Sequence, residues 1–179
     1  MPEEAHSTPV VRVEAAESNG TATAISGGTD HDLLSLAAQL CFALYSTSRS
    51  MTAAYRPFLD AMGVTYPQYL ALLALWERPA ITMKELGEQL RLDYGTVSPL
   101  IQRLQAHGLV ESIRSTHDRR AVELRATEAG KALQHQAREM IESVLVAVDY
   151  PLETVIALRD QVNALGERLD TIVAERSQR

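Results

Sequence analysis

The sequence predicts a mainly α-helical protein with one small β-hairpin wing. Apolar residues recur at the helical period of 3.6 residues over most of the chain after residue 29. Strand character is confined to two short segments, 109–114 and 121–126, which are separated by a polar loop. With 179 residues, 46% of them hydrophobic, the chain is long and apolar enough for one compact domain and a tail.

Residues 1–28 are predicted to be a disordered acidic tail. The segment is rich in Ala, Glu, Ser, Thr and Gly, a composition that buries little apolar surface. Residues 1–32 hold six acidic residues against Arg12 alone, a net charge of −5, whereas residues 91–125 hold six arginines and four acidic residues, a net charge of +2. The overall charge of −6 therefore does not exclude a nucleic-acid partner, because the charges are segregated along the chain.

The first helix is predicted over residues 29–62. Thr29 and Asp30 are suitable N-terminal caps, and Gly63 is a suitable residue for the C-terminal end. Pro57 is expected to bend the helix near that end. Its apolar face follows the helical period at Leu33, Leu36, Ala37, Leu40, Leu44 and Thr47.

Three more helices precede the hairpin. One is predicted over residues 65–76, and a short one follows Thr82, which forms a capping-box pattern with Glu85. The next begins after the cap Asp93 and stops at Gly108. After the hairpin, helices are predicted over residues 127–148 and 152–174, separated by Tyr150-Pro151.

This order of helix, short helix, longer helix and hairpin is that of a winged helix-turn-helix, whose second helix reads the DNA major groove. The residues at the start of that helix are small or polar, as contacts with base edges require: Asp93, Tyr94, Gly95, Thr96 and Ser98. Arg103 is placed to meet a phosphate or a guanine. At the hairpin tip, Arg119 and Arg120 suit a narrow minor groove, and Asp118 is placed to orient one of them. The alternative is a structural helical hairpin whose charged loop is only solvated.

A single cysteine, Cys41, lies in the first predicted helix. Tyr45, four residues later, is its neighbour on the same helical face. Tyr55 is fourteen residues away, which is about 21 Å along a straight helix, so it reaches a thiol only on an antiparallel partner helix. The spacing between Cys41 and Tyr55 favours a site that is shared between two subunits. The alternative is an inert, small apolar cysteine beside tyrosines that pack an interface.

Four segments carry a resemblance to a known family: Leu90 to Ile101, Gly108-Leu109-Val110, Asp118-Arg119-Arg120 and Leu124 to Gly130. Together they resemble the MarR family of dimeric repressors. The segment 39–45, followed by Tyr55-Arg56-Pro57, Leu59 and residues 65–69, is similar to the organic-hydroperoxide-sensing branch, OhrR, in its one-cysteine subtype. The resemblance implies that Cys41 is the reactive cysteine, that Tyr45 and Tyr55 are its phenolic partners, and that Arg120 is the wing arginine. The family often has Asp-Glu-Arg at the wing tip, where this chain has Asp118-Arg119-Arg120.

The resemblance implies a transcriptional repressor, not an enzyme, with the MarR-type domain over residues 29–179. Helices 29–62 and 150–176 would form the homodimer, and residues 65–148 the winged helix-turn-helix and a linking helix. Reduced protein would bind a pseudo-palindromic operator. An organic hydroperoxide would oxidise Cys41 to the sulfenic acid, a low-molecular-weight thiol would cap it, and DNA would be released.

Two other functions fit parts of the sequence. A MarR-type regulator could be released by a reversible small phenolic ligand, with Cys41 incidental. A thiol peroxidase is disfavoured, because no arginine or histidine lies one turn from Cys41 to polarise a peroxide.

Other sites and compartments find little support in the sequence. Neither a metal nor a cofactor is expected, because the five histidines are scattered and no glycine-rich phosphate loop is present. No apolar run reaches the roughly 20 residues that span a bilayer, and the N-terminus lacks the features of a signal peptide. A cytoplasmic protein without a membrane partner is therefore expected.

Overall fold

The computed structural model describes residues 34–114 and 122–177. The chain forms two compact units, Met1–Ala43 and Leu44–Arg179. In the described part of the first unit, Leu36–Ala38 form a 3₁₀ turn, η1, and Gln39 is extended with φ −82° and ψ 113°. The long helix α2 begins only after this break, at Leu40, and runs to Met62.

The prediction of one helix starting at Thr29 and Asp30 is therefore wrong for residues 36–39, while residues 29 and 30 lie outside the described residues. Residues 34–43 are all exposed, so no packing favours the α-helical turn over the 3₁₀ turn. At its other end α2 passes through Pro57 and is followed by Gly63 with φ +68°, which confirms the predicted end.

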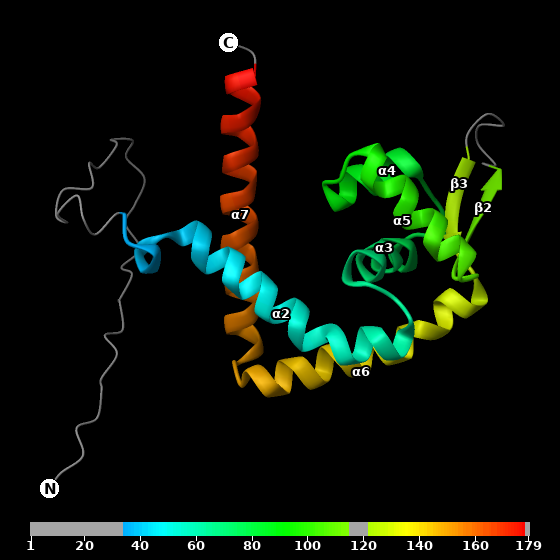
Figure 1. Ribbon diagram of the computed structural model, residues 1–179, viewed down its shortest axis with the longest axis horizontal. Helices are drawn as coiled ribbons and strands as arrows, with labels where there is room; N and C mark the ends of the chain where they lie inside the picture. The colour runs from blue at the N-terminus through cyan, green and yellow to red at the C-terminus, as the bar shows by residue number, and fades with distance from the viewer. Residues whose placement is uncertain (1–33, 115–121, 178–179) are drawn as a thin grey trace, which may run out of the picture. The chain divides into compact units, whose positions relative to one another are not determined.

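The remaining helices confirm the predicted order (Figure 1). They are α3 (Tyr66–Glu77), α4 (Met83–Leu90), α5 (Tyr94–Ala106), α6 (Glu128–Val148) and α7 (Leu152–Ser177). Local caps set several of these boundaries. The backbone N–H of Thr82 donates to Glu85 Oε2 at 2.8 Å, and the backbone N–H of Glu85 donates to Thr82 Oγ1 at 3.2 Å, which is the predicted capping box.

A small antiparallel sheet has the strand order β1-β3-β2, with β2 at Val110–Arg114 and β3 at Val122–Ala126. These two strands are the predicted hairpin, in a register that pairs Ser112 with Leu124. A third strand that was not predicted, β1 (Ile81–Thr82), pairs with β3 through Ile81 and Leu124. Two residues are too few to show alternation, so β1 is recognisable only once β3 is in place.

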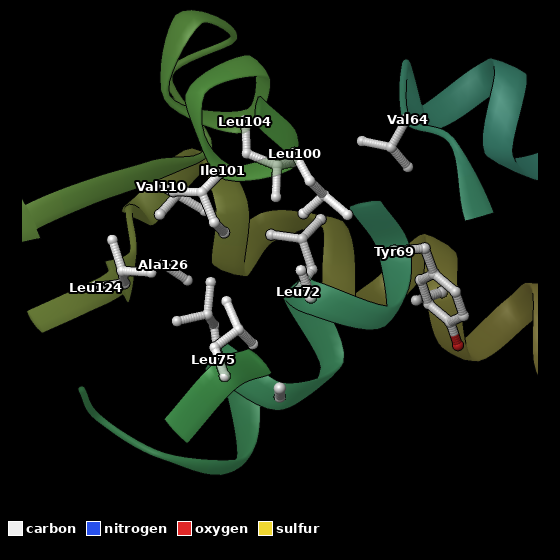
Figure 2. Packing of buried hydrophobic residues seen from close by; sticks show 14 of the residues in the cluster. Val64, Tyr69, Leu72, Leu75, Leu100, Ile101, Leu104, Val110, Leu124 and Ala126 are labelled. Atoms are coloured by element: carbon white, nitrogen blue, oxygen red, sulfur yellow. The ribbon is translucent and has the colours of Figure 1, made fainter. Parts of the chain in front are cut away.

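The core joins α3, α5 and the sheet. Figure 2 shows Leu72 and Leu75 of α3 turned toward the same cluster as the labelled residues of α5 and the sheet. The largest side chains that are fully buried are Leu72, Ile81, Leu86, Val97, Ile101, Leu104, Leu124 and Met140. Tyr69 lies at the edge of the cluster, with its hydroxyl directed away from the leucines. This packing holds α5 firmly against the sheet and leaves the helix N-terminus exposed.

The start of α6 is fixed by a close approach at Gly130. A Cβ atom there would overlap the carbonyl oxygen of Leu109, so only glycine fits without a shift of the backbone. The indole Nε1–H of Trp76 donates to the Gly130 carbonyl at 3.1 Å. The Trp76 side chain is half-buried against the core.

Candidate functional site

The N-terminus of α5 carries most of the residues predicted to read DNA. Asp93 is its cap, as predicted: Oδ1 accepts from the Thr96 backbone N–H at 3.0 Å, and Oδ2 accepts from the Thr96 hydroxyl at 2.9 Å. Both hydrogen bonds lower the pKa of Asp93, the side-chain bond contributing most. Asp93 and Thr96 thus bind each other in the free protein, and the Thr96 oxygen can still accept a hydrogen bond.

The other predicted residues of α5 differ in exposure. Tyr94 is 71% exposed, and Ser98 is half-buried. Arg103 is exposed in the last turn and forms no ion pair with any other residue in the described ranges. Gln105, near the C-terminus of α5, donates from Nε2 to Ser112 Oγ at 2.7 Å and so ties the helix to β2. The N-terminal turn of α5 is therefore exposed and polar, while the C-terminal end of the helix is held against the sheet.

The wing is described only at its base. Asp118, Arg119 and Arg120 lie outside the described residues. In the strands below them, Arg125 Nε donates to Glu111 Oε1 at 2.8 Å across the directly paired positions of β3 and β2. The ion pair is exposed and links the two strands of the hairpin through one directly paired position.

All three residues of the predicted redox site lie on α2. Cys41 is a free thiol and is exposed. Tyr45 is 57% exposed, and its hydroxyl oxygen accepts from Arg49 Nη1 at 2.9 Å. The guanidinium of Arg49 also lies over the Tyr45 ring, 5.6 Å from its centroid. Because Arg49 occupies a lone pair of the phenol oxygen, the hydroxyl proton of Tyr45 remains free for another acceptor.

Tyr55 belongs to a cluster of three phenols. Its ring centroid lies 5.9 Å from that of Tyr66 and 6.4 Å from that of Tyr69, and the latter two are 6.2 Å apart. Burial, and then the neighbouring Tyr66, raise the pKa of Tyr55; burial and both neighbours raise the pKa of Tyr69 to about 12. Tyr55 is therefore a neutral phenol, able to donate a hydrogen bond, throughout the physiological pH range.

A cavity of about 550 Å³ opens between the second half of α2 and the start of α3. Its lining includes Arg49, Thr52 and Arg56 from α2, and Thr65 and Tyr66 at the start of α3. The volume is within the roughly 300–1,000 Å³ typical of sites for small molecules. The Arg49 side chain that holds Tyr45 thus also borders a space large enough for an organic compound.

Three residues of these contacts, Tyr66, Tyr69 and Arg49, were not predicted to belong to the site. Arg49 was recognisable in principle, because it lies four residues after Tyr45 on one helix. The grouping of Tyr55 with Tyr66 and Tyr69 required knowing how α2 packs against α3, and no local pattern encodes that packing.

Within residues 34–114 and 122–177, no three His, Cys, Asp or Glu side chains are grouped so that they could hold a metal ion. None of the helices described here is long and apolar enough to cross a membrane.

Comparison with known proteins gives consistent matches. A model of the MarR family matches residues 62–121. The organic hydroperoxide resistance transcriptional regulator of Bacillus subtilis is 46% identical over 138 residues, covering 77% of this chain and 94% of that protein.

Solved structures of AbfR are similar in fold. AbfR of Staphylococcus epidermidis has a TM-score of 0.65 at 30% identity, covering 76% of this chain and 93% of that one. Reduced AbfR bound to DNA has a TM-score of 0.62 at 32% identity, covering 75% and 93%. The predicted fold class, mainly α with a small β-hairpin in a winged helix-turn-helix, is thereby confirmed.

Proposed function

Because the chain belongs to the MarR family of transcriptional regulators, we propose that it is a dimeric repressor that releases its operator when an organic hydroperoxide oxidises Cys41. Members of this family are DNA-binding regulators and not enzymes. The name of the Bacillus subtilis relative, organic hydroperoxide resistance transcriptional regulator, supports the class of signal. AbfR has been solved bound to DNA in its reduced and in its overoxidised form, which supports DNA binding by an oxidisable protein of this fold.

The observation that carries the proposal is an exposed, solitary thiol on the helix that also carries two phenol donors. In the single chain a peroxide has access to Cys41, and oxidation of a cysteine depends on access and on the thiolate form. Tyr45 has a hydroxyl proton to donate, and Tyr55 stays neutral. In this proposal both phenols donate to the thiolate and stabilise it.

The chemistry proceeds in two steps. The thiolate of Cys41 attacks the outer peroxide oxygen, the O–O bond breaks, and the alkoxide leaves and takes a proton from water to become an alcohol. Sulfur is oxidised to the sulfenic acid while the peroxide is reduced. A low-molecular-weight thiol then displaces the sulfenic hydroxyl as water, which leaves a mixed disulfide on Cys41. The uncharged sulfur no longer holds the phenol hydrogen bonds that the thiolate held.

DNA binding is assigned to α5 and the wing. In this proposal α5 enters the major groove with Tyr94, Thr96 and Ser98 toward the bases, while Arg103 contacts a phosphate. Asp93 acts mainly as the cap that orders the first turn. Asp118, Arg119 and Arg120 are proposed as the minor-groove contact on the ground of the resemblance, because they lie outside the described residues.

The proposed dimer is formed by the first and last helices. α7 has no buried side chain in the single chain, and it exposes Leu152, Ile156, Leu158, Val162, Leu169, Ile172 and Val173. Such a surface is expected to pack against a second copy. A pseudo-palindromic operator then follows from the two-fold symmetry of the dimer. An antiparallel pair of α2 helices would also bring Tyr55 of one subunit to Cys41 of the other.

The cavity beside Arg49 favours a second candidate, release by a reversible small phenolic ligand. Its lining includes Arg49, two threonines and the pair of Arg56 and Asp60, 3.8 Å apart, which suit a ligand with a hydroxyl group. In that case Cys41 would be incidental. The two candidates differ in reversal, because a bound ligand leaves on dilution whereas an oxidised thiol requires a reductant.

The test compares the wild type with Cys41→Ser in gel-shift titrations, with intact mass measured on the same samples. We expect equal operator affinity for both reduced proteins. Adding an organic hydroperoxide and a small thiol should release only the wild type, together with the mass increase of one thiol adduct. Release of Cys41→Ser by peroxide would refute the thiol mechanism. Release by phenols without a mass change, reversed by dilution, would establish the ligand mechanism instead.

A further inference from the structure

Arg91 occupies an unfavourable backbone position between the two helices of the helix-turn-helix. It is the C-terminal cap of α4, with φ 55° and ψ 40°, and it lies two residues before the cap of α5. Glycine adopts this left-handed conformation freely, whereas a residue with a Cβ is strained there. Among the described residues only Arg91 and Asp149 combine a side chain with a positive φ. Arg91, with its long cationic side chain, therefore occupies a backbone conformation that glycine would adopt with less strain.

The guanidinium of Arg91 reaches α7. Its Nη1 lies 3.0 Å from Asp170 Oδ2. One turn earlier on α7 is Gly166, and a Cβ atom at Gly166 would lie only 3.2 Å from the same Nη1. Glycine weakens the interior of a helix, but here it leaves room for the guanidinium against the helix backbone. Two locally unfavourable residues, Arg91 and Gly166, thus meet at one contact.

This contact adds little to stability. The side chains of Arg91 and Asp170 are 61% and 66% exposed, and exposed ion pairs contribute little to folding. The ion pair instead fixes the position of α7 relative to the helix-turn-helix. No side chain of α7 is buried, so packing alone restrains the position of this helix little. The turn that carries Arg91 leads directly into α5, so restraining Arg91 also restrains the start of α5.

We propose that Arg91 and Asp170 form a tether between the helix-turn-helix and α7 that sets where the recognition helix stands relative to the dimer. Arg91 is a positioning residue in this inference, which rests on the proposed function only in taking α7 as a dimerisation helix and α5 as the DNA-reading helix. In a dimer the tether occurs twice, and together the two copies define the distance between the recognition helices. That distance determines which half-site spacing the protein accepts.

The rival explanation is that Arg91 is a DNA contact. It is an exposed cation two residues before the cap of α5, so it could neutralise a phosphate directly. Asp170 separates the two explanations. If Arg91 binds phosphate, then removing the charge of Asp170 frees the guanidinium, and DNA binding stays equal or becomes tighter. If Arg91 is a tether, the same change weakens binding.

The DNA experiment uses reduced, full-length protein and a set of operators whose half-sites differ by single base pairs. Asp170→Asn is expected to weaken binding to the best operator by about two- to tenfold and to flatten the preference for its spacing. The double variant Arg91→Asp with Asp170→Arg should restore both. Equal or tighter binding by Asp170→Asn, or a double variant as weak as Arg91→Asp alone, would overturn the tether.

Substitution by glycine supplies a matched control for folding. Arg91→Gly and Asp149→Gly each remove a side chain from a left-handed helix cap, so neither should lower the thermal unfolding temperature. Only Arg91→Gly should lose the spacing preference. Equal spacing profiles for the two variants would show that Arg91 has no positional role.

A distance measurement makes the result independent of DNA binding and of peroxide sensing. Spin labels at Gln102→Cys on α5 and Glu175→Cys on α7, in a Cys41→Ser background diluted with unlabelled protein, report the distance within one chain. We expect one narrow distribution that broadens on adding Asp170→Asn. An identical distribution in both proteins would refute the tether, while failure of the proposed function would appear separately, in the peroxide titration of Cys41→Ser.

Discussion

The DNA-reading segment and the last helix differ in how much of their apolar surface is buried within one chain. From α3 to β3, the chain buries a continuous apolar core, and α5 is capped by Asp93 and tied to the sheet by Gln105. α7 is longer than α5, yet it has no buried side chain and exposes seven large apolar residues. The first segment is complete within one chain, whereas α7 needs a partner to bury its apolar surface. We infer that DNA reading is a property of the monomer fold and that sensing is a property of the assembly.

A matched pair of leucines gives the largest expected contrast. Leu72 in α3 is fully buried, and Leu169 in α7 is 51% exposed. Leu72→Ala should lower the free energy of unfolding by about 2–5 kcal/mol, through lost burial and the cavity left behind. Leu169→Ala should change the stability of the single chain by less than about 0.5 kcal/mol but weaken dimerisation.

Urea denaturation and sedimentation equilibrium across a range of protein concentrations would separate these effects. Loss of stability in Leu72→Ala should be present at every concentration. A Leu169→Ala protein that remains as dimeric as the wild type would remove α7 from the proposed interface.

A substitution at Gly130 tests how closely α6 packs against the segment from α3 to β3. The Cβ of Gly130→Ala would overlap the Leu109 carbonyl, so the start of α6 must move away from the hairpin. We expect a loss of about 1–3 kcal/mol in the free energy of unfolding. Trp76, the only tryptophan, donates to the Gly130 carbonyl, so its fluorescence should change in the folded state. Unchanged stability and emission would mean that the contact is looser than the structure indicates.

The smallest expected effect concerns the cap of the recognition helix. Hydrogen bonds from Thr96 hold the pKa of Asp93 below its ordinary value of 3.8, so the ionised cap stabilises α5 above that pH. The contribution is lost as the pH falls through the lower, folded-state pKa. Asp93→Asn keeps an acceptor oxygen but not the charge, and should be slightly less stable at pH 7. Thermal melts of both proteins should converge in acid, and a constant difference down to pH 2 would contradict the assignment.

The sequence predicted best those features that are encoded locally. Thr82 with Glu85, Asp93, Gly63 and Gly108 each set a helix boundary through groups a few residues apart, and these boundaries are confirmed. The cysteine and the phenols of α2 were identified as a candidate redox site from residue type and helical spacing, and their role in sensing stays a prediction.

The features that the sequence did not predict depend on packing between distant segments. β1 exists because Ile81 meets Leu124 of β3. The phenol cluster exists because Tyr55 of α2 packs against Tyr66 and Tyr69 of α3. The contact between Arg91 and Asp170 joins a turn to a helix near the end of the chain. The start of α2 was placed too early because helical periodicity continues through residues that no packing holds in an α-helix.

The central claim, that sensing requires two chains, is tested most directly by the oxidation rate of mixed dimers. In the first, one chain carries Tyr55→Phe and the other carries Cys41→Ser, so the remaining thiol has the intact Tyr55 only on its partner. In the second, both substitutions are on one chain and the other is wild type, so the remaining thiol faces the missing phenol. We predict that the first dimer is oxidised by an organic hydroperoxide at the wild-type rate and that the second is slow. Slow oxidation of the first dimer and normal oxidation of the second would place the contact within one chain and contradict the account.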